Sequence, residues 1–243
     1  MPSNPAKGAA FMMQGIRLIT RPGLKRFVLI PLLVNIVVFS GAIWYGTAQF
    51  EGLMLRLQSA VPDWLGWLEW LLWPVFILAL LIIVFYCFTL IANLIASPFN
   101  GLLAEKTEAL LTGRPLADSN DMKKLFRELP MTLIDETRKL VYAIVWSIPF
   151  LILAFIVPVV GPLIWFLFTA WMLAVQYSDF PMGNHGLKFR DMRATLRRRR
   201  FLSLGFGAAA AGLTMIPVVN FIAMPAAVAG ATAMWVRELR PAD

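Results

Sequence analysis

Two long runs of apolar residues dominate the first half of the chain. Residues 27–50 and 71–97 contain no charged side chain. A helix needs about 20 apolar residues to cross the ~30 Å hydrocarbon core of a bilayer. Pro31 and Pro74 fall near the start of each run, where the missing N–H of proline costs a helix little. We therefore predict two transmembrane helices, 27–50 and 71–97.

Four shorter apolar runs follow in the second half and form two pairs. They are 141–157 and 163–177 around Pro158–Pro162, and 204–216 and 221–236 around Pro217–Asn220. At about 1.5 Å per residue each run extends roughly 20–25 Å, which is less than the hydrocarbon core. We predict two proline-broken helical hairpins, 141–177 and 204–236, each of which either enters the bilayer and returns or crosses it narrowly. Irregular backbone at this depth survives only where protein or water satisfies it, so the breaks are candidates to line a pathway.

Charged residues gather outside these runs. Residues 99–140 carry seven basic and seven acidic side chains and predict two amphipathic helices, 101–111 and 122–140. Residues 178–203 carry seven basic and two acidic side chains and predict a basic loop.

The distribution of Lys and Arg predicts the orientation. The segment before the first apolar run has five basic residues and no acidic one, whereas residues 51–70 have one basic residue. Because basic residues accumulate on the cytoplasmic side, both termini and both charged segments are expected in the cytoplasm.

The composition supports a membrane protein and argues against a soluble one. Hydrophobic residues make up 59% of the chain and charged residues 15%, against about 25% charged residues in soluble domains. We predict an all-α integral membrane protein that forms one membrane domain, residues 1–243. The net charge of +8 does not indicate nucleic-acid binding, because no aromatic residues interleave with the Arg197–Arg200 run. That run indicates contact with anionic lipid headgroups, or else an electrostatic funnel for an anionic solute.

Signatures of enzymes, metals and cofactors are absent from the sequence. It contains no phosphate-binding loop and no HExxH motif, and Cys87 and His185 are its single cysteine and histidine. One histidine cannot form a metal site alone, so we expect no metal, no cofactor and no enzyme activity. His185 lies in a turn-like Gly183–Gly186 segment, as a solvated residue or as a proton-sensing group.

The segment Thr20–Arg26 is the best candidate for an anion site. Thr20 is a possible N-cap, Pro22 and Gly23 open a turn, and three cationic residues lie beside the start of a long helix. Free N–H groups and a partial positive charge at a helix N-terminus bind sulfate or phosphate. The alternative is a positive anchor that only sets the topology.

Glu105 lies in the first turn or so of the predicted 101–111 helix. The helix dipole favours an acidic residue there, which is a sufficient structural explanation. A role in gating or coupling is the functional alternative for Glu105, as it is for His185.

Seven short motifs along nearly the whole chain resemble the CysZ family of bacterial inner-membrane sulfate permeases. They are Arg21–Phe27, Val61–Leu65, Pro98–Glu105, Leu163–Phe168, Ala170–Ala174, Met215–Pro217 and Gly230–Val236. The resemblance implies sulfate uptake for cysteine biosynthesis, two partly penetrating hairpins, and sulfate binding at Gly23, Leu24, Lys25 and Arg26. Relatives often have arginine at the position of Lys25, and lysine lacks the planar fork of arginine, so Arg26 ranks above it.

Our hypothesis is therefore sulfate permeation, through a channel or with coupled protons. The main alternative is an assembly or accessory protein of the membrane that transports nothing. Apolar arms too short to cross suggest that subunits cover one another's broken ends, so we expect a homo-oligomer.

Overall fold

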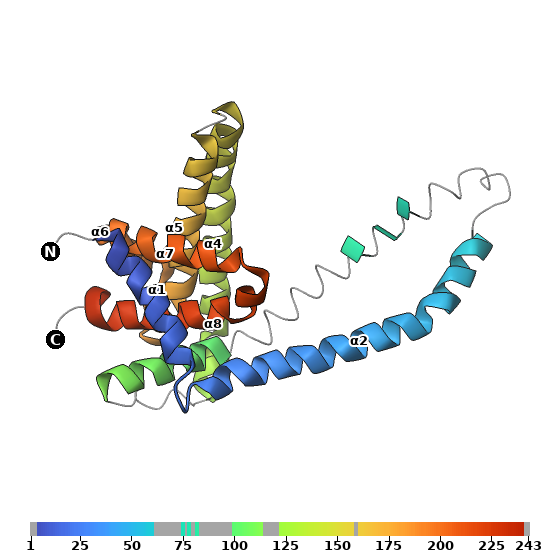
Figure 1. Ribbon diagram of the computed structural model, residues 1–243, viewed down its shortest axis with the longest axis horizontal. Coiled ribbons are helices and arrows are strands. Elements are labelled where there is room, and N and C mark those ends of the chain that lie inside the picture. Colours follow the sequence, from blue (N-terminus) through green and yellow to red (C-terminus); the bar gives the residue numbers. More distant parts are fainter. Residues whose placement is uncertain are drawn as a thin grey trace. The chain divides into compact units, whose positions relative to one another are not determined.

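The computed structural model describes residues 4–60, 74–75, 77–78, 81–82, 99–113, 122–157 and 160–240, and the elements in these ranges are helices (Figure 1). They are α1 (Pro5–Ile19), α2 (Lys25–Ala60), a helix over residues 99–112, α4 (Met122–Ile156), α5 (Gly161–Asn184), α6 (Phe189–Arg198), α7 (Arg200–Thr214), α8 (Pro217–Met234) and the π-helical turn η2 (Trp235–Leu239). The all-α prediction is confirmed. The chain forms two compact units, Met1–Val28 with Asn100–Asp243 (the first unit) and Leu29–Phe99 (the second unit).

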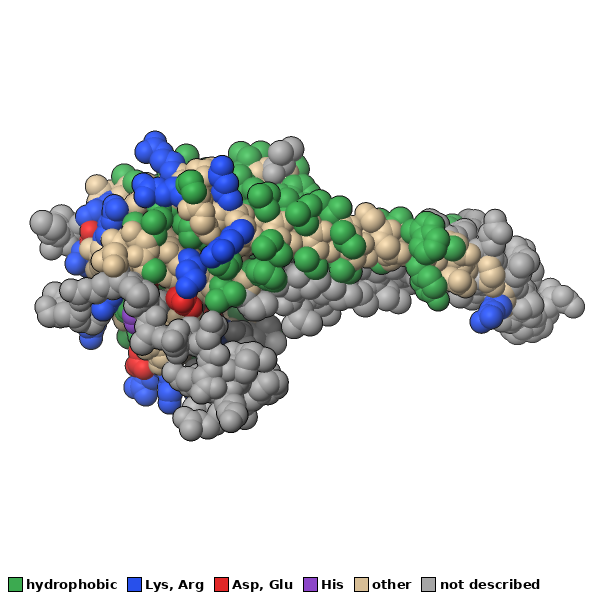
Figure 2. All heavy atoms as spheres, turned by 90° about the horizontal axis from the view of Figure 1, so that it is seen from below, with side chains coloured by type: hydrophobic (Ala, Val, Ile, Leu, Met, Phe, Trp, Pro, Cys, Tyr) green, Lys and Arg blue, Asp and Glu red, His purple; other side chains and the backbone are tan. Residues whose placement is uncertain are grey.

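The first predicted transmembrane run is helical throughout. α2 contains residues 27–50 and continues to Ala60, and its stretch Lys25–Tyr45 is long and apolar enough to cross a membrane. Its apolar side chains are exposed, as at Val37, which is 70% exposed, and hydrophobic side chains follow the helix along the face in Figure 2. Such a surface is stable in lipid and not in water. The second predicted run, 71–97, lies outside the described residues except for three helical pairs.

The first hairpin consists of α4 and α5, which lie side by side (Figure 1). The predicted amphipathic helix 122–140 and the hairpin arm 141–157 are one continuous helix, α4, which corrects the predicted boundary between them. At the turn, a Cβ on Gly161 would lie 2.4 Å from the Ala154 carbonyl oxygen. Glycine is therefore required for α5 to begin so close to α4.

The two helices of this hairpin are joined by polar contacts at the level where α4 turns apolar. Lys139 Nζ lies 2.5 Å from an oxygen of Asp179, and Trp171 Nε1 donates to the Tyr142 hydroxyl at 3.1 Å. From Val141 to Ile156, α4 is a short apolar helix. The charged pair and the Tyr–Trp pair thus lie at the boundary expected between water and lipid.

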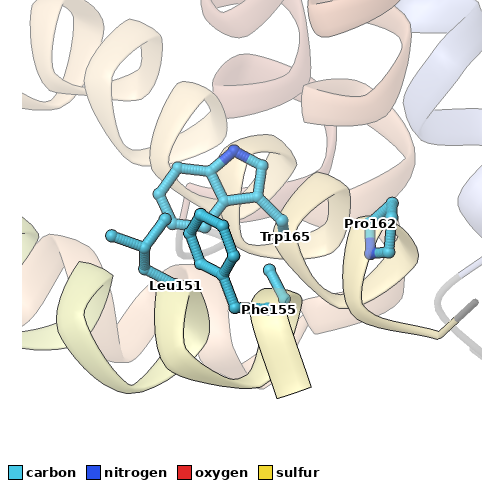
Figure 3. A pocket seen from close by; sticks show the side chains of 5 residues that line it. Leu151, Phe155, Pro162 and Trp165 are labelled. Atoms are coloured by element: carbon cyan, nitrogen blue, oxygen red, sulfur yellow. The ribbon is translucent and has the colours of Figure 1, made fainter. Parts of the chain in front are cut away.

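Apolar side chains cover the far end of the α4/α5 hairpin. Phe155 is 80% exposed, and an open pocket of about 280 Å³ lies beside it. Figure 3 shows the lining residues Leu151, Phe155, Pro162 and Trp165 around that pocket. Such an apolar surface is stable when lipid or protein covers it, and not in water.

The second hairpin, α7 and α8, runs across the first (Figure 1). The chain reverses at Met215 and Ile216, and Pro217 begins α8. The two helical arms of the 204–236 hairpin are confirmed, whereas residues 217–220, predicted as the break between them, form the first turn of α8. Unlike the first hairpin, α8 is largely buried, because α1, α5 and α7 all pack on it. The two hairpins, which the sequence presents as a pair of one kind, therefore differ in their surroundings.

Glycines allow the helices of this core to touch at backbone distance. A Cβ on Gly207 of α7 would lie 1.8 Å from the Ala170 oxygen of α5, and one on Gly15 of α1 would lie 2.0 Å from the Ala226 oxygen of α8. α1 was not predicted as a helix.

The basic segment 178–203, predicted as a loop, is helical: it contains the end of α5, all of α6 and the start of α7. In α6 the apolar residues Phe189, Met192 and Leu196 are buried. Their spacing places them on one helix face, so the basic residues on the other side do not prevent a packed helix.

Candidate anion and proton sites

The turn between α1 and α2 contains the predicted sulfate residues. Gly23 has a φ of +92°, a left-handed conformation that only glycine adopts readily. Leu24 is buried in the same apolar cluster as Ile19 and Leu103. The predicted N-cap role of Thr20 is wrong, since its hydroxyl donates to the Arg17 carbonyl and the residue ends α1. The turn is thus held by its leucine while its polar groups face outward.

The start of α2 leaves backbone donors available in this turn. The Leu24 and Lys25 N–H groups donate to the Arg21 carbonyl at 3.2 and 3.4 Å. For Gly23 and Arg26, no carbonyl of the described residues accepts the N–H. A helix N-terminus with unsatisfied N–H groups carries a partial positive charge and attracts anions.

Three cationic residues belong to the same turn. Arg21, Lys25 and Arg26 are all exposed, and the Arg26 guanidinium lies 4.9 Å from the centre of the Phe27 ring. Stacking on the ring limits the freedom of Arg26 while its N–H groups stay accessible. The arrangement can hold a tetrahedral oxyanion by charge-assisted hydrogen bonds.

A second polar site lies inside the first unit, around Glu108. The Glu108 side chain is 1% exposed, and both of its oxygens lie 2.8 Å from His185 Nε2. Arg240 Nη1 donates to Oε1 at 3.2 Å. Burying a lone carboxylate would cost several kcal/mol, so the contacts with His185 and Arg240 are what make the position tenable.

Three separate elements hold His185 in this site. His185 is the C-cap of α5, and the preceding Asn184 donates from Nδ2 to the Gly101 carbonyl at 3.1 Å. The Trp235 ring lies 5.5 Å from the imidazole, centre to centre. With a side chain 22% exposed, His185 is neither a fully solvated loop residue nor sealed from water. The structure thus places it in contact with a buried acid.

The C-terminal π-turn supplies partners that the sequence did not reveal. In η2 the Arg240 N–H donates to the Trp235 carbonyl at 2.8 Å, a bond that spans five residues. This wider turn directs Trp235 to His185 and Arg240 to Glu108. π-Turns are rare and frequently occur at functional sites. No sequence pattern marked Arg240.

Glu105, the predicted coupling residue, lies elsewhere on the same helix. Its carboxylate is 3.2 Å from Lys106 Nζ, whereas His185 is paired with Glu108, about one turn further along. A spacing of three residues puts both acids on nearly the same side of the helix. In the sequence, this spacing was the one sign that Glu108 is as good a candidate for a coupling role as Glu105.

Several buried polar atoms near these elements have no partner among the described residues of the first unit. They are Asn100 Nδ2, Thr107 Oγ1, Ser178 Oγ and Trp235 Nε1. Buried polar groups are normally satisfied, often by water. Within the described ranges no three His, Cys, Asp or Glu side chains come together as metal ligands.

A family model described as sulfate transporter CysZ/Etoposide-induced protein 2.4 matches residues 11–225. The chain belongs to this family. The sulfate transporter CysZ of Salmonella typhimurium is 46% identical over 235 residues, which cover 96% of this chain and 92% of that protein. The proteins of the same name from Salmonella paratyphi A and Salmonella typhi match with the same identity and coverage. The resemblance found in the seven motifs is thereby confirmed.

Proposed function

We propose that the protein takes up sulfate across the bacterial inner membrane and supplies it to cysteine biosynthesis, as a transporter and not an enzyme. The observation that carries this proposal is the 46% identity, over nearly the full length, to proteins named sulfate transporters. The exposed cationic turn before α2 gives that likeness a chemical basis.

The proposed sulfate site is the turn Gly23, Leu24, Lys25 and Arg26. Gly23 supplies the left-handed backbone, Leu24 anchors the turn in the core, and the Gly23 and Arg26 N–H groups point to no other acceptor among the described residues. Arg26 can grip two sulfate oxygens with its planar fork, whereas Lys25 acts as a point charge. Both charges add to the dipole of α2.

The energetics of uptake favour coupling to protons or steady consumption of sulfate inside the cell. Moving a divalent anion into a negative interior costs about 4.6 kcal/mol per 100 mV. We assign the proton-binding role to His185 with Glu108, because both Glu108 oxygens lie 2.8 Å from His185 Nε2 while the histidine side chain keeps contact with water. Glu108 would hold the imidazolium by charge-assisted hydrogen bonds.

The topology is part of the same proposal. Both termini, the helix over residues 99–112 and the basic helix α6 face the cytoplasm, since they carry most of the Lys and Arg residues. The protein acts as a homo-oligomer, in which neighbouring subunits cover the exposed end of the α4/α5 hairpin.

The test is uptake of radiolabelled sulfate into proteoliposomes that contain the full chain. Replacing Arg26 with alanine is expected to lower uptake about tenfold or more, because a charge-assisted bidentate contact is lost. Arg26→Lys should recover part of the activity. Arg17→Ala is the matched control: this exposed arginine ends α1 outside the turn, and its loss should leave uptake near the wild-type level.

Two outcomes would contradict parts of the proposal. Unchanged uptake by Arg26→Ala would remove the assignment of the turn but leave sulfate transport standing. A wild-type protein with neither flux nor affinity for sulfate would favour the accessory role in the membrane.

A further inference from the structure

The four consecutive arginines at the end of α6 and the start of α7 differ in their contacts. Arg199 Nη1 lies 3.3 Å from a Glu238 oxygen, and the Arg200 guanidinium lies 5.2 Å from the centre of the Phe201 ring. Arg197 and Arg198 are exposed, and neither forms an ion pair within the described residues. Arg199 is therefore the member of the run that is paired with an acid of another element, whereas Arg197, Arg198 and Arg200 are exposed.

The outward-facing cations belong to one face of α6. Arg190 is exposed like Arg197 and Arg198, and a spacing of seven or eight residues keeps the three on the same side of a helix. Phe189, Met192 and Leu196 fill the opposite, buried face. We call Arg190, Arg197 and Arg198 the outer arginine face; the one acid on this helix is Asp191.

Contacts on the inner side of α6 place this helix beside the start of the apolar stretch of α4. The Arg193 guanidinium lies 4.8 Å from the centre of the Tyr142 ring of α4, and the Phe189 ring meets the same tyrosine edge-on at 5.5 Å. Tyr142 stands at the start of the apolar stretch Val141–Ile156. α6 therefore packs at the level where α4 leaves water.

The start of α7, the next helix, independently indicates that this part of the protein lies at the membrane boundary. Phe201, the second residue of α7, is 49% exposed beside the basic run. Aromatic residues next to cations are typical of the boundary between headgroups and acyl chains. Figure 2 shows Lys and Arg side chains gathered over the first unit.

We propose that the outer arginine face of α6 binds the headgroups of anionic phospholipids and fixes the first unit at the cytoplasmic membrane surface. Along the helix axis Arg190 and Arg197 stand roughly 10 Å apart. One sulfate ion cannot bridge that distance, whereas neighbouring headgroups in a lipid surface can contact each arginine separately. This assignment is independent of which solute the protein carries.

Native mass spectrometry of the full chain in detergent, titrated with phosphatidylglycerol or phosphatidylcholine, tests the proposal. Wild-type protein is expected to prefer phosphatidylglycerol. The triple variant Arg190→Gln, Arg197→Gln, Arg198→Gln should lose about fivefold in phosphatidylglycerol affinity for each arginine removed, with phosphatidylcholine binding unchanged.

Two controls distinguish headgroup binding from a general effect of the substitutions on the fold. The triple lysine variant, Arg190→Lys, Arg197→Lys, Arg198→Lys, keeps the charges and should keep the preference for phosphatidylglycerol. Sulfate affinity of the glutamine variant should match the wild type, because the Gly23–Arg26 turn is intact. Equal phosphatidylglycerol binding by wild type and glutamine variant would overturn the proposal, as would a loss of sulfate binding with lipid binding retained.

Discussion

Replacing Gly207 with alanine is expected to lower the free energy of unfolding by about 3 kcal/mol or more. The new Cβ would lie 1.8 Å from the Ala170 carbonyl oxygen, and a backbone atom inside a packed helix cannot move aside as a flexible side chain can. α5 and α7 would have to separate, which would also disturb α1 and α8 in the same core. The thermal unfolding midpoint of the purified full chain in detergent measures the effect.

Gly212 in the same helix provides the matched control. Nothing lies within 4 Å of a Cβ built there. Alanine at an open helical position is expected to raise stability by about 0.5–1 kcal/mol, since glycine is the weaker helix former. The two substitutions should therefore have opposite signs. Ala170→Gly should not rescue Gly207→Ala, because the clash is with a backbone oxygen. Equal effects of the two substitutions would contradict the close contact of α5 and α7.

Replacing Glu108 with alanine is expected to destabilise the first unit by about 3 kcal/mol. The substitution leaves His185 and Arg240 without their common acceptor and opens a void in a buried site. Both partners keep some contact with water, which limits the penalty to the lower end of the range for buried ion pairs. Thermal unfolding in detergent measures this loss as well.

The isosteric variant Glu108→Gln separates charge from shape. It keeps the volume and a hydrogen-bond acceptor but cannot balance an imidazolium. Sulfate uptake into proteoliposomes should then lose its dependence on external pH, because the proposed proton-binding pair no longer contains a carboxylate. His185→Gln should have the same effect, and the double variant should be little worse than either single one, since coupled residues are not additive.

Glu105→Gln is the control for this experiment. Glu105 contacts Lys106, and the carboxylate paired with His185 belongs to Glu108, so uptake by this variant should keep its response to pH. If uptake by Glu105→Gln no longer depended on pH while uptake by Glu108→Gln still did, the coupling role would belong to Glu105, as the sequence suggested.

The apolar runs of the sequence determined the class of the protein and much of its helical layout. A stretch without charges from 27 to 50 has to be helical in lipid, because only a helix satisfies its own backbone there. Likewise, Pro217 marks where α8 begins, since proline lacks the N–H that would continue α7. The motif Arg21–Phe27 also predicted the turn before α2 and its cations, as local backbone chemistry and charge are properties of neighbouring residues.

Whether an apolar helix face meets protein or is left exposed, by contrast, was decided only by the tertiary structure. An apolar helix face has the same periodicity whether it meets lipid or protein, so the sequence could not show that α8 is buried while the end of the α4/α5 hairpin is exposed. For the same reason the burial of Phe189 and Met192, which makes the basic segment a helix, was not evident.

The cluster of Glu108, His185 and Arg240 shows most clearly what the sequence could not predict. In the sequence, His185 lies 77 positions from Glu108 and Arg240 lies 132 positions from it. Patterns in a single sequence carry no information about contacts at such separations. Likewise, the four arginines Arg197–Arg200 are chemically equal in the sequence. Only the tertiary structure shows that Arg199 pairs with Glu238, whereas Arg197 and Arg198 are exposed on α6. The sequence by itself determined that this is an α-helical membrane protein with a cationic turn before a long helix. The tertiary structure decided which acid, which histidine and which arginines stand together, because that depends on how distant helices pack.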